Sequence, residues 1–305
     1  MKLVTFSTPT NPTPTMGAVQ DGNVYDLANC AKALGVSLPS DVRSLLEAGE
    51  VGGLAAAKYV LAQAVAQGLL FFPEGIVKLY SPITNPHKIL CLAGNYQEHI
   101  KEGGGKAVDK TRITPRVFIK PITTLCGDGD PILLPEVSHW VDYELELAII
   151  IGKTGSGIAV ADALNHVAGY AVYNDISSRK LTIAEGRDKR DGDGWFDWLN
   201  GKWQDNSGPM GPYLVTADEV PNGDNLWMKL WVNNELKQNS DTSKMIFNVA
   251  ETIAFASRLM TLQPGDIIAT GTPSGVGATT NTYLKSGDVV RCEIEGLGVL
   301  DNTVA

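Results

Sequence analysis

Short apolar runs, each bounded by glycine, proline or other turn-forming residues, recur from Lys88 onward. Runs of four to eight residues between such breaks are typical of β-strands, whereas helices need longer periodic stretches. Only Ile246–Met260 interrupts this pattern in the C-terminal third as an expected helix. We therefore expect an α+β fold that is mostly β, with a rolled or barrel-like mixed sheet and peripheral helices. The expected strands include Ile89–Leu92, Arg116–Ile119, Leu145–Ile151, Ala168–Val172, Trp227–Val232, Ile267–Ala269 and Val289–Ile294.

The first 80 residues have a different pattern, which predicts a small α/β domain. A strand at Lys2–Phe6 and a hairpin turn at Asp21–Asn23 come first, and helical composition follows at Asp41–Ala48 and Leu54–Gly68. The segment Leu79–Pro86 carries two prolines, which favour extended backbone and element boundaries. We place the domain junction there and predict domains at 1–80 and 81–305.

Charge and cysteine spacing exclude several classes of function. The formal net charge of −9 is the wrong sign for binding nucleic acid, whose phosphates require clustered Lys and Arg. The four cysteines form no C-x-x-C pair, so neither a thiolate zinc site nor a disulfide framework is indicated. The sequence has no basic, apolar leader and no apolar run near the roughly 18 residues that span a membrane. We expect a cytoplasmic protein that binds neither nucleic acid nor membrane.

Three acidic residues alternate with apolar ones where a strand is expected: Asp142, Glu144 and Glu146. On a strand they would share one face, and their mutual repulsion would be relieved by a hard cation. Oxygen ligands select Mg²⁺, Mn²⁺ or Ca²⁺ over zinc, and a site with few protein ligands favours Mg²⁺ or Mn²⁺. A solvated strand face is the alternative at this point.

Two further groups of residues suggest chemistry, each with an ordinary structural alternative. His99 and Glu102 are three residues apart and would face each other on a helical turn, where a carboxylate can orient an imidazole that acts as general base. An exposed amphipathic turn would show the same spacing. Asp175 ends an apolar strand, where it can serve simply as a turn residue.

The glycine-rich segment 269–277 follows an expected strand but lacks the Lys-Ser/Thr pair and the helix of a phosphate-binding loop. We therefore reject a nucleotide site. Its backbone amides and the Thr272 hydroxyl remain suited to a substrate carboxylate.

Taken in order, the motifs resemble those of the fumarylacetoacetate hydrolase family. The resemblance covers residues 88–302, and the ordered co-occurrence is far more specific than any one motif. The motifs are C-x-x-x-N-Y-x-x-H-x-x-E at 91–102, F-x-K-P at 118–121, D-Y-E-x-E-L at 142–147, G-Y-x-x-x-N-D-I-S-x-R at 169–179, G-K-W with P-M-G-P at 201–212, V-N-x-E-L at 232–236 and T-L-x-P-G-D-I-I-A-T-G-T-P-S-G-V-G at 261–277.

The resemblance implies a homodimer with a rolled β domain and, in longer members, a small N-terminal domain. It also implies a Mg²⁺ or Mn²⁺ site, with Ca²⁺ as a substitute in crystals, and a pair of residues that activates a water. The metal ligands would be Glu144, Glu146 and Asp175, with Asp142 behind them. The catalytic residues would be His99, Glu102 and Lys202, and the substrate contacts Lys120, Arg179, Gly271 and Thr272.

The family's substrates are 2-oxo or 1,3-dicarbonyl acids, so the resemblance implies a small-molecule partner of this kind. We predict a hydrolase that cleaves a C–C bond in an acylpyruvate-like or 2,4-diketo acid, in aromatic or sugar-acid catabolism, through an enolate. The alternative is a decarboxylase or an isomerase/tautomerase acting on oxaloacetate or hydroxymuconate-type acids, because these reactions share the enolate. A catalytically silent binding protein is a weaker alternative, because such a protein need not keep all five of the dyad and metal residues.

The chain also departs from the family pattern. Ala93 stands where Gly is common and Gly94 where a larger residue is common, which would reshape the floor of the site. Thr182 stands at or near a usual Gln. The charged, aromatic-ended segment Glu185–Trp198 would overhang the pocket or form a solvated loop, and the second is the commoner behaviour of such segments.

Overall fold

The computed structural model describes residues 1–184 and 186–305. Its N-terminal elements are β1 (Lys2–Thr8), β2 (Asn11–Gln20), β3 (Asn23–Asp26), α1 (Leu27–Ala33), α2 (Val42–Glu47), α3 (Ala56–Gln67), β4 (Phe71–Pro73) and β5 (Lys78–Tyr80). The later helices are α4 (Gln97–Glu102), α5 (Asp193–Asn200), α6 (Val249–Leu259) and α7 (Gly277–Thr280). The later strands are β6 (Ile89–Ala93), β7 (Arg116–Lys120), β8 (Leu125–Cys126), β9 (Trp140–Asp142), β10 (Leu145–Ile151), β11 (Val167–Asn174), β12 (Ser177–Arg179), β13 (Gly208–Thr216), β14 (Trp227–Val232), β15 (Glu235–Asp241), β16 (Ile267–Ala269), β17 (Val289–Ile294) and β18 (Gly298–Thr303).

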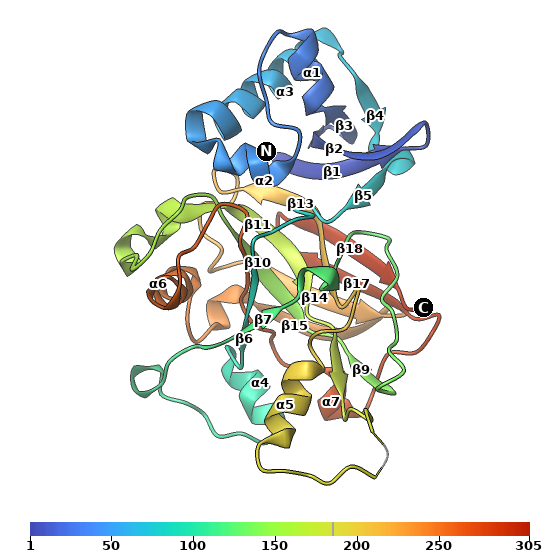
Figure 1. Cartoon of the computed structure of the whole chain (residues 1–305), viewed down its shortest axis with the longest axis vertical. Coiled ribbons are helices and arrows are strands. Elements are labelled where there is room, and N and C mark those ends of the chain that lie inside the picture. The colour runs from blue at the N-terminus through green and yellow to red at the C-terminus, as the bar shows by residue number, and fades with distance from the viewer. Residues whose placement is uncertain (185) are drawn as a thin grey trace.

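A twelve-stranded mixed sheet organises the molecule, with the path β4-β3-β2-β1-β13-β11-β10-β16-β6-β7 (Figure 1). Strand β10 lies in its middle, antiparallel to β11 and β16. All seven of its residues are buried, and alternate ones enter two different hydrophobic clusters. Burial on both faces explains why the strand is one continuous apolar run after Glu146.

A second sheet, β15-β14-β17-β18, packs against the first, and the two-stranded pair β12-β9 lies near the end that carries α4, α5 and α7 (Figure 1). The larger core contains Leu147 and Ile149 from β10 together with Leu230 of β14 and Ile294 of β17. The strand-rich α+β class is confirmed. The sheets formed by the described residues are open, so the rolled shape arises from packed sheets rather than from a closed barrel.

The N-terminal segment is built around the predicted hairpin. Asp21 and Gly22 both have positive φ, as a two-residue hairpin turn requires, and Gly68 ends α3 in the left-handed region. Strand β1 pairs with β13, and the core beneath α1 and α3 also includes Ile89 and Ala148. The boundary at residue 80 therefore stays a prediction, because strand pairing and core packing both continue across it.

No helix among the described residues is long and apolar enough to cross a membrane. The polar residues predicted for the site gather at one end of the large sheet. There α4, α5 and α7 lie close together (Figure 1), although α4 and α7 are far apart in the sequence.

Candidate active site

Glu144, Glu146 and Asp175 form a buried cluster, and one carboxylate oxygen from each lies within 4.8 Å of the other two. Pairing between β10 and β11 creates this cluster, since Leu145 is opposite Asn174. Glu144 comes directly before β10 and Asp175 directly after β11, so both lie next to this pair. The Asp175 amide also donates to the Glu144 carbonyl at 2.8 Å.

The prediction that Asp142, Glu144 and Glu146 share one continuous strand face is wrong. Strand β9 ends at Asp142 and β10 begins at Leu145. Asp142 accepts hydrogen bonds from the amides of Tyr143, Gly277 and Ala278 and from Arg179. These side-chain bonds compete with ladder pairing, and the strand is interrupted at Tyr143 and Glu144. Asp142 therefore lies behind the cluster.

Three buried or partly buried cations hold the cluster. The Lys202 ammonium lies 2.7 Å from both Glu144 and Asp175, and Arg179 bridges Glu144 and Asp142. Burial alone would raise the pKa of Glu144, but the charges of Lys202 and Arg179 outweigh it and lower that pKa. Opposite charges within a few ångströms favour the ionised carboxylate.

We predicted that Lys120 contacts the substrate, but its ammonium is bound by groups of the chain itself. Its ammonium donates to Asp175 at 2.6 Å and to the carbonyls of Ile176 and Ser207 at 3.2 and 2.9 Å. These three bonds occupy all the donors of a lysine. In this arrangement Lys120 positions Asp175.

Glu146 differs from its two neighbours, since no cation pairs with it in the described part of the chain. It accepts one hydrogen bond, from the Gly271 amide at 2.7 Å. Burial, and then the charges of Asp175 and Glu144, raise the pKa of Glu146 well above its usual value. A divalent cation would remove this repulsion, and an all-oxygen donor set suits a hard ion. The three carboxylates therefore fit a metal site.

The predicted dyad is present on α4. His99 Nδ1 lies 2.8 Å from Glu102 Oε1, while Glu102 Oε2 accepts from the Gly275 amide at 2.8 Å and the Thr279 hydroxyl at 3.2 Å. Burial would raise the pKa of Glu102, but these hydrogen bonds together lower it, so the carboxylate is ionised at neutral pH. The Glu102 carboxylate accepts a hydrogen bond from His99 Nδ1, so the imidazole proton is on Nδ1. The Nε2 lone pair of His99 is then available to act as a base.

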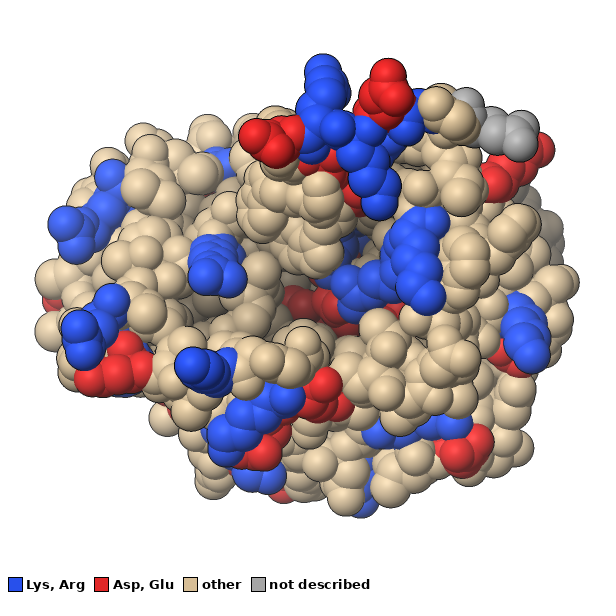
Figure 2. All heavy atoms as spheres, turned by 90° about the horizontal axis from the view of Figure 1, so that it is seen from below, with Lys and Arg blue, Asp and Glu red and all other residues tan. Residues whose placement is uncertain are grey.

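His99 of the dyad and Glu144 of the cluster both line one cavity of about 410 Å³. Figure 2 shows this end of the molecule, where acidic atoms lie in the floor of a hollow and basic side chains lie around it. Trp195 and Trp198 of α5 and Phe118 of β7 form apolar walls, and Lys202 lies 5.5 Å from the centres of the Trp198 and Phe118 rings. His99, Glu144, Arg179, Lys202 and Thr272 also line the cavity.

The glycine-rich loop binds carboxylates of the chain itself. Its amides at Gly271, Gly275 and Gly277 donate to Glu146, Glu102 and Asp142, respectively. The Gly271 amide, which we predicted to contact substrate, is thus directed at Glu146, one of the three clustered carboxylates.

Thr272 remains directed at the cavity, and Gln238 sets the direction of its hydroxyl. Gln238 Oε1 accepts from the Leu145 amide at 2.9 Å, while Nε2 donates to the Pro273 carbonyl at 2.9 Å and to Thr272 Oγ1 at 2.8 Å. The two backbone partners fix the amide orientation, so Thr272 Oγ1 accepts from Gln238 and its own hydrogen is available to a ligand. Nothing in the sequence pattern singled out Gln238.

Part of the segment Glu185–Trp198 forms α5, a helix that we did not predict. Glu185 lies outside the described residues. Arg187 pairs with Asp197, whereas Trp195 and Trp198 contribute to the cavity. Its amphipathic W-F-x-W pattern was the available signal, but the surrounding glycines and charges favoured a loop.

Comparison with known proteins gives the same family at the level of sequence and structure. A family described as "Fumarylacetoacetate (FAA) hydrolase C-terminal" matches residues 88–305. The chain is 41% identical to the oxaloacetate tautomerase fahd2, mitochondrial, of Xenopus laevis, over 100% of this chain and 90% of that protein.

Among solved structures, the chain resembles maleylpyruvate hydrolase from Sphingobium sp. SYK-6 in complex with manganese(II) ion and pyruvate. The TM-score is 0.77 and the identity 32%, with 100% of this chain and 99% of that chain covered. It also resembles 2-hydroxyhepta-2,4-diene-1,7-dioate isomerase from Mycobacterium marinum, with a TM-score of 0.73, 26% identity and coverage of 100% and 98%. This chain belongs to the fumarylacetoacetate hydrolase family.

Proposed function

We propose that the protein is a divalent-metal-dependent isomerase that interconverts the keto and enol forms of 2-oxo acids of the oxaloacetate type. The observation that carries the proposal is that one cavity is lined both by His99, which is paired with Glu102, and by Glu144, which belongs to the buried carboxylate cluster with Glu146 and Asp175. Relatives from Xenopus laevis and Homo sapiens are named oxaloacetate tautomerases, and these names support this reading over the hydrolase that we first predicted.

The chain's own groups would share the work of proton transfer. His99 would take the proton from C3 of the keto acid through Nε2, and the enol forms when the 2-oxo oxygen of the resulting enolate gains a proton; in the reverse direction that oxygen loses its proton and His99 returns one to C3. Glu102 would stabilise the imidazolium that forms, because it stays ionised at Nδ1. Thr272 would donate its hydroxyl hydrogen to the acid, and Lys202 would compensate the negative charge of the enolate.

Glu144, Glu146 and Asp175 would hold a Mg²⁺ or Mn²⁺ ion. Such an ion supplies Lewis acidity toward the 2-oxo group and a template for the adjacent carboxylate. Glu144, Glu146 and Asp175 are all buried, so the fold excludes much of the solvent from the ion site. Burial strengthens every electrostatic interaction with the developing enolate charge.

A C–C hydrolase is the second candidate, and the likeness to maleylpyruvate hydrolase over the whole chain favours it. His99 would then deprotonate a water that adds to the distal carbonyl of an acylpyruvate, and the bond between that carbon and C3 would break. The electron pair of that bond becomes the enolate of pyruvate, which gains a proton. Both candidates need the same stabilised enolate.

Product analysis separates the two. The protein with Mg²⁺ or Mn²⁺ is given the enol form of oxaloacetate and, separately, an acylpyruvate, and the products are identified by mass. We expect faster loss of the enol absorbance with all four carbons retained. Unaccelerated enol decay, together with stoichiometric release of pyruvate and a second acid from the acylpyruvate, would assign the protein to the hydrolases instead.

A further inference from the structure

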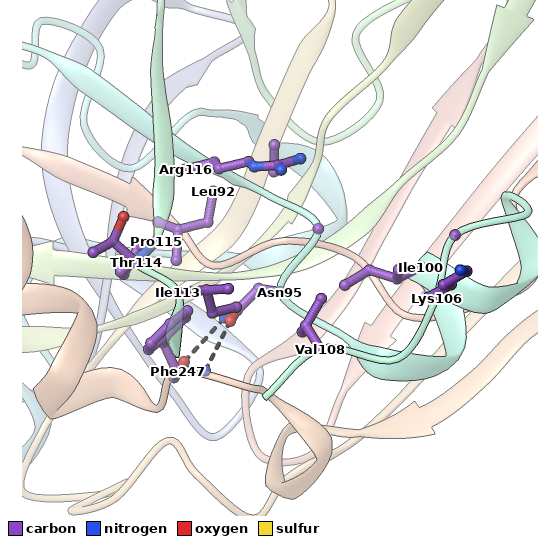
Figure 3. A pocket seen from close by; sticks show the side chains of 13 residues that line it. Leu92, Asn95, Ile100, Lys106, Val108, Ile113, Thr114, Pro115, Arg116 and Phe247 are labelled. Atoms are coloured by element: carbon purple, nitrogen blue, oxygen red, sulfur yellow. Dashed lines mark hydrogen bonds between the residues drawn. The ribbon is translucent and has the colours of Figure 1, made fainter. Parts of the chain in front are cut away.

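Asn95 is a buried polar residue between β6 and α4, in the wall of a cavity of about 300 Å³ that adjoins the catalytic one. Its Oδ1 accepts from the Phe247 backbone N–H at 2.8 Å, and its Nδ2 donates to the Phe247 carbonyl at 3.0 Å (Figure 3). Nδ2 also donates to the Thr270 carbonyl at 2.9 Å. All three partners are backbone groups, so the side-chain amide has only one orientation that satisfies them.

The bond to Thr270 reaches the peptide group that binds the acidic cluster. The Thr270 carbonyl accepts from Asn95, and the N–H of the same peptide unit is that of Gly271. This N–H donates to Glu146 Oε2 at 2.7 Å. The peptide is trans and planar, so its C=O and N–H point in opposite directions. A hydrogen bond that fixes the carbonyl on one side therefore fixes the direction of the N–H on the other.

Gly271 does not fix the orientation of this peptide by itself. Its φ is 88°, and glycine adopts positive and negative φ at similar cost, so the residue does not oppose rotation of the peptide plane. Rotation would turn the Thr270 carbonyl oxygen toward Glu146, and two acceptors would then face each other. A Cβ at Gly271 would lie 2.9 Å from the Asn95 Cβ, so the close approach of Asn95 itself requires glycine here. A partner outside the loop must therefore hold the N–H toward the carboxylate.

Glu146 depends on this N–H more than its two neighbours in the cluster depend on any one donor. The Gly271 N–H is its single hydrogen-bond donor among the described residues, and no described cation pairs with it. Asn95, Thr270 and Glu146 are all buried. Hydrogen bonds in series strengthen one another in such surroundings, and a buried group that loses its partner is costly.

The backbone of Asn95 has a separate role from its side chain. Its carbonyl accepts from the Ile246 N–H at 2.7 Å, and the next residue, Tyr96, pairs with Met245 in a β-bridge. These contacts hold the chain just before α4, the helix that carries the dyad, and they do not involve the Asn95 side chain. Substitution of that side chain should therefore leave α4 in place.

We propose that Asn95 is a positioning residue for the acidic cluster. Through the Thr270–Gly271 peptide it holds a hydrogen-bond donor on Glu146 and so keeps that carboxylate in the geometry that binds a divalent cation. This inference rests on the proposed metal site and deepens it, because it names the residue that orients one of the three carboxylates. Groups that orient a metal-binding side chain typically contribute a factor of about 10 to 100 to metal affinity.

Metal affinity tests the proposal. Asn95→Asp keeps the shape of the side chain but replaces its NH₂ group with an oxygen that faces two carbonyls. Calorimetric titration of the metal-free protein with Mn²⁺ should give a Kd about 10- to 100-fold higher than that of the wild type. At saturating Mn²⁺ the kcat for enol oxaloacetate should approach the wild-type value, because Asn95 does not line the catalytic cavity. A general structural defect would not be rescued by metal in this way.

A matched control comes from Asn302, a second buried asparagine. Its Nδ2 donates to the carbonyls of Gly127 and Asp130 at 2.8 and 2.9 Å, and it lines no part of the catalytic cavity. Asn302→Asp should lower the unfolding temperature but leave the Kd for Mn²⁺ unchanged. Asn95→Ser leaves room for a water that can donate to the Thr270 carbonyl, so its Kd should rise less than that of Asn95→Asp. This milder variant keeps the test available if Asn95→Asp does not fold.

Amide hydrogen exchange tests the same geometry without metal. Exchange of the Gly271 N–H in the metal-free protein, followed by NMR, should be faster in Asn95→Asp than in the wild type and in Asn302→Asp. Unchanged Mn²⁺ affinity or unchanged exchange in the Asn95 variants, or an equal rise in Kd in Asn302→Asp, would overturn the inference, while Mn²⁺ binding by the wild type would leave the proposed function intact. A wild type that binds no Mn²⁺ would overturn the proposed metal site and this inference together.

Discussion

Buried neighbours determine whether a side chain in the cavity donates or accepts a hydrogen bond. Thr272 illustrates this, because the amide of Gln238 can only donate to its oxygen. The threonine was identified from the sequence through its family motif, whereas Gln238 was not. Gln238 belongs to the polar hairpin strand β15, and its contact with Thr272 exists only after β15 and the glycine-rich loop have come together.

We predict that Gln238 acts through Thr272. Gln238→Glu keeps the shape of the side chain but removes the donor to Thr272, so the hydroxyl hydrogen can turn away from the cavity. We expect kcat/KM for oxaloacetate to fall roughly 10-fold or more, as one hydrogen bond to a charged group implies. Thr272→Val should cause a similar loss, and Thr272→Ser should restore activity.

The double variant decides between this role and a general structural one. If both residues serve the same hydrogen bond, Gln238→Glu should add little to the loss already caused by Thr272→Val. Losses that add fully, each with a lowered unfolding temperature, would mean that Gln238 supports the fold independently.

The elements differ in how far the sequence predicts them. Strand β10 was predicted to its end residues, because burial on both faces requires an unbroken apolar run. The acidic residues before it were placed on one strand face, which is wrong because Asp142 binds three amides and Arg179. The glycine-rich loop was predicted as a loop, but its partners Glu146 and Glu102 are 125 and 173 residues away in the sequence. Tertiary contacts of this range leave no local pattern.

The attachment of α4 to the glycine-rich loop should depend on pH. Hydrogen bonds from His99, Gly275 and Thr279 lower the pKa of Glu102 from its ordinary value of 4.5. A carboxyl whose pKa is lowered on folding stabilises the fold above its unfolded pKa, and this contribution is lost as the pH falls through the folded pKa. Glu102→Gln should therefore reduce the free energy of unfolding by about 1 kcal/mol at pH 7.

Unfolding by urea across the pH range measures this difference. The gap between the wild type and Glu102→Gln should narrow as the pH falls below about 4, because protonation then removes the same charge from the wild type. A gap that stays constant from pH 3 to pH 8 would show that the charge of Glu102 contributes nothing.

On the scale of the whole molecule, the site depends on distant parts of the chain that meet at one end of the sheet. The dyad comes from α4, and the three clustered carboxylates come from the start of β10, the residue before it and the residue after β11. Lys202 comes from the segment after α5, and Thr272 from the loop after β16. The fold class and the family followed from the sequence, because ordered motifs span most of the chain. The predicted homodimer and cytoplasmic location stay predictions.

Metal binding should stabilise the whole fold. An ion held by Glu144, Glu146 and Asp175 binds the folded state only, which adds about 2.7 kcal/mol at a free concentration of 100 times Kd. We expect Mn²⁺ or Mg²⁺ to raise the unfolding temperature of the wild type and not that of Glu146→Ala. An equal rise in the variant would place the ion elsewhere.

Proton transfer by His99 is tested most directly by the rate at which enol oxaloacetate becomes the keto form with saturating Mg²⁺. Wild type and His99→Ala should bind metal and oxo acid alike by calorimetry, but the variant should lose about 100-fold or more in kcat, as expected for a general base. Equal rates in the two proteins would contradict the assignment of His99 as the base and, with it, the proposed mechanism.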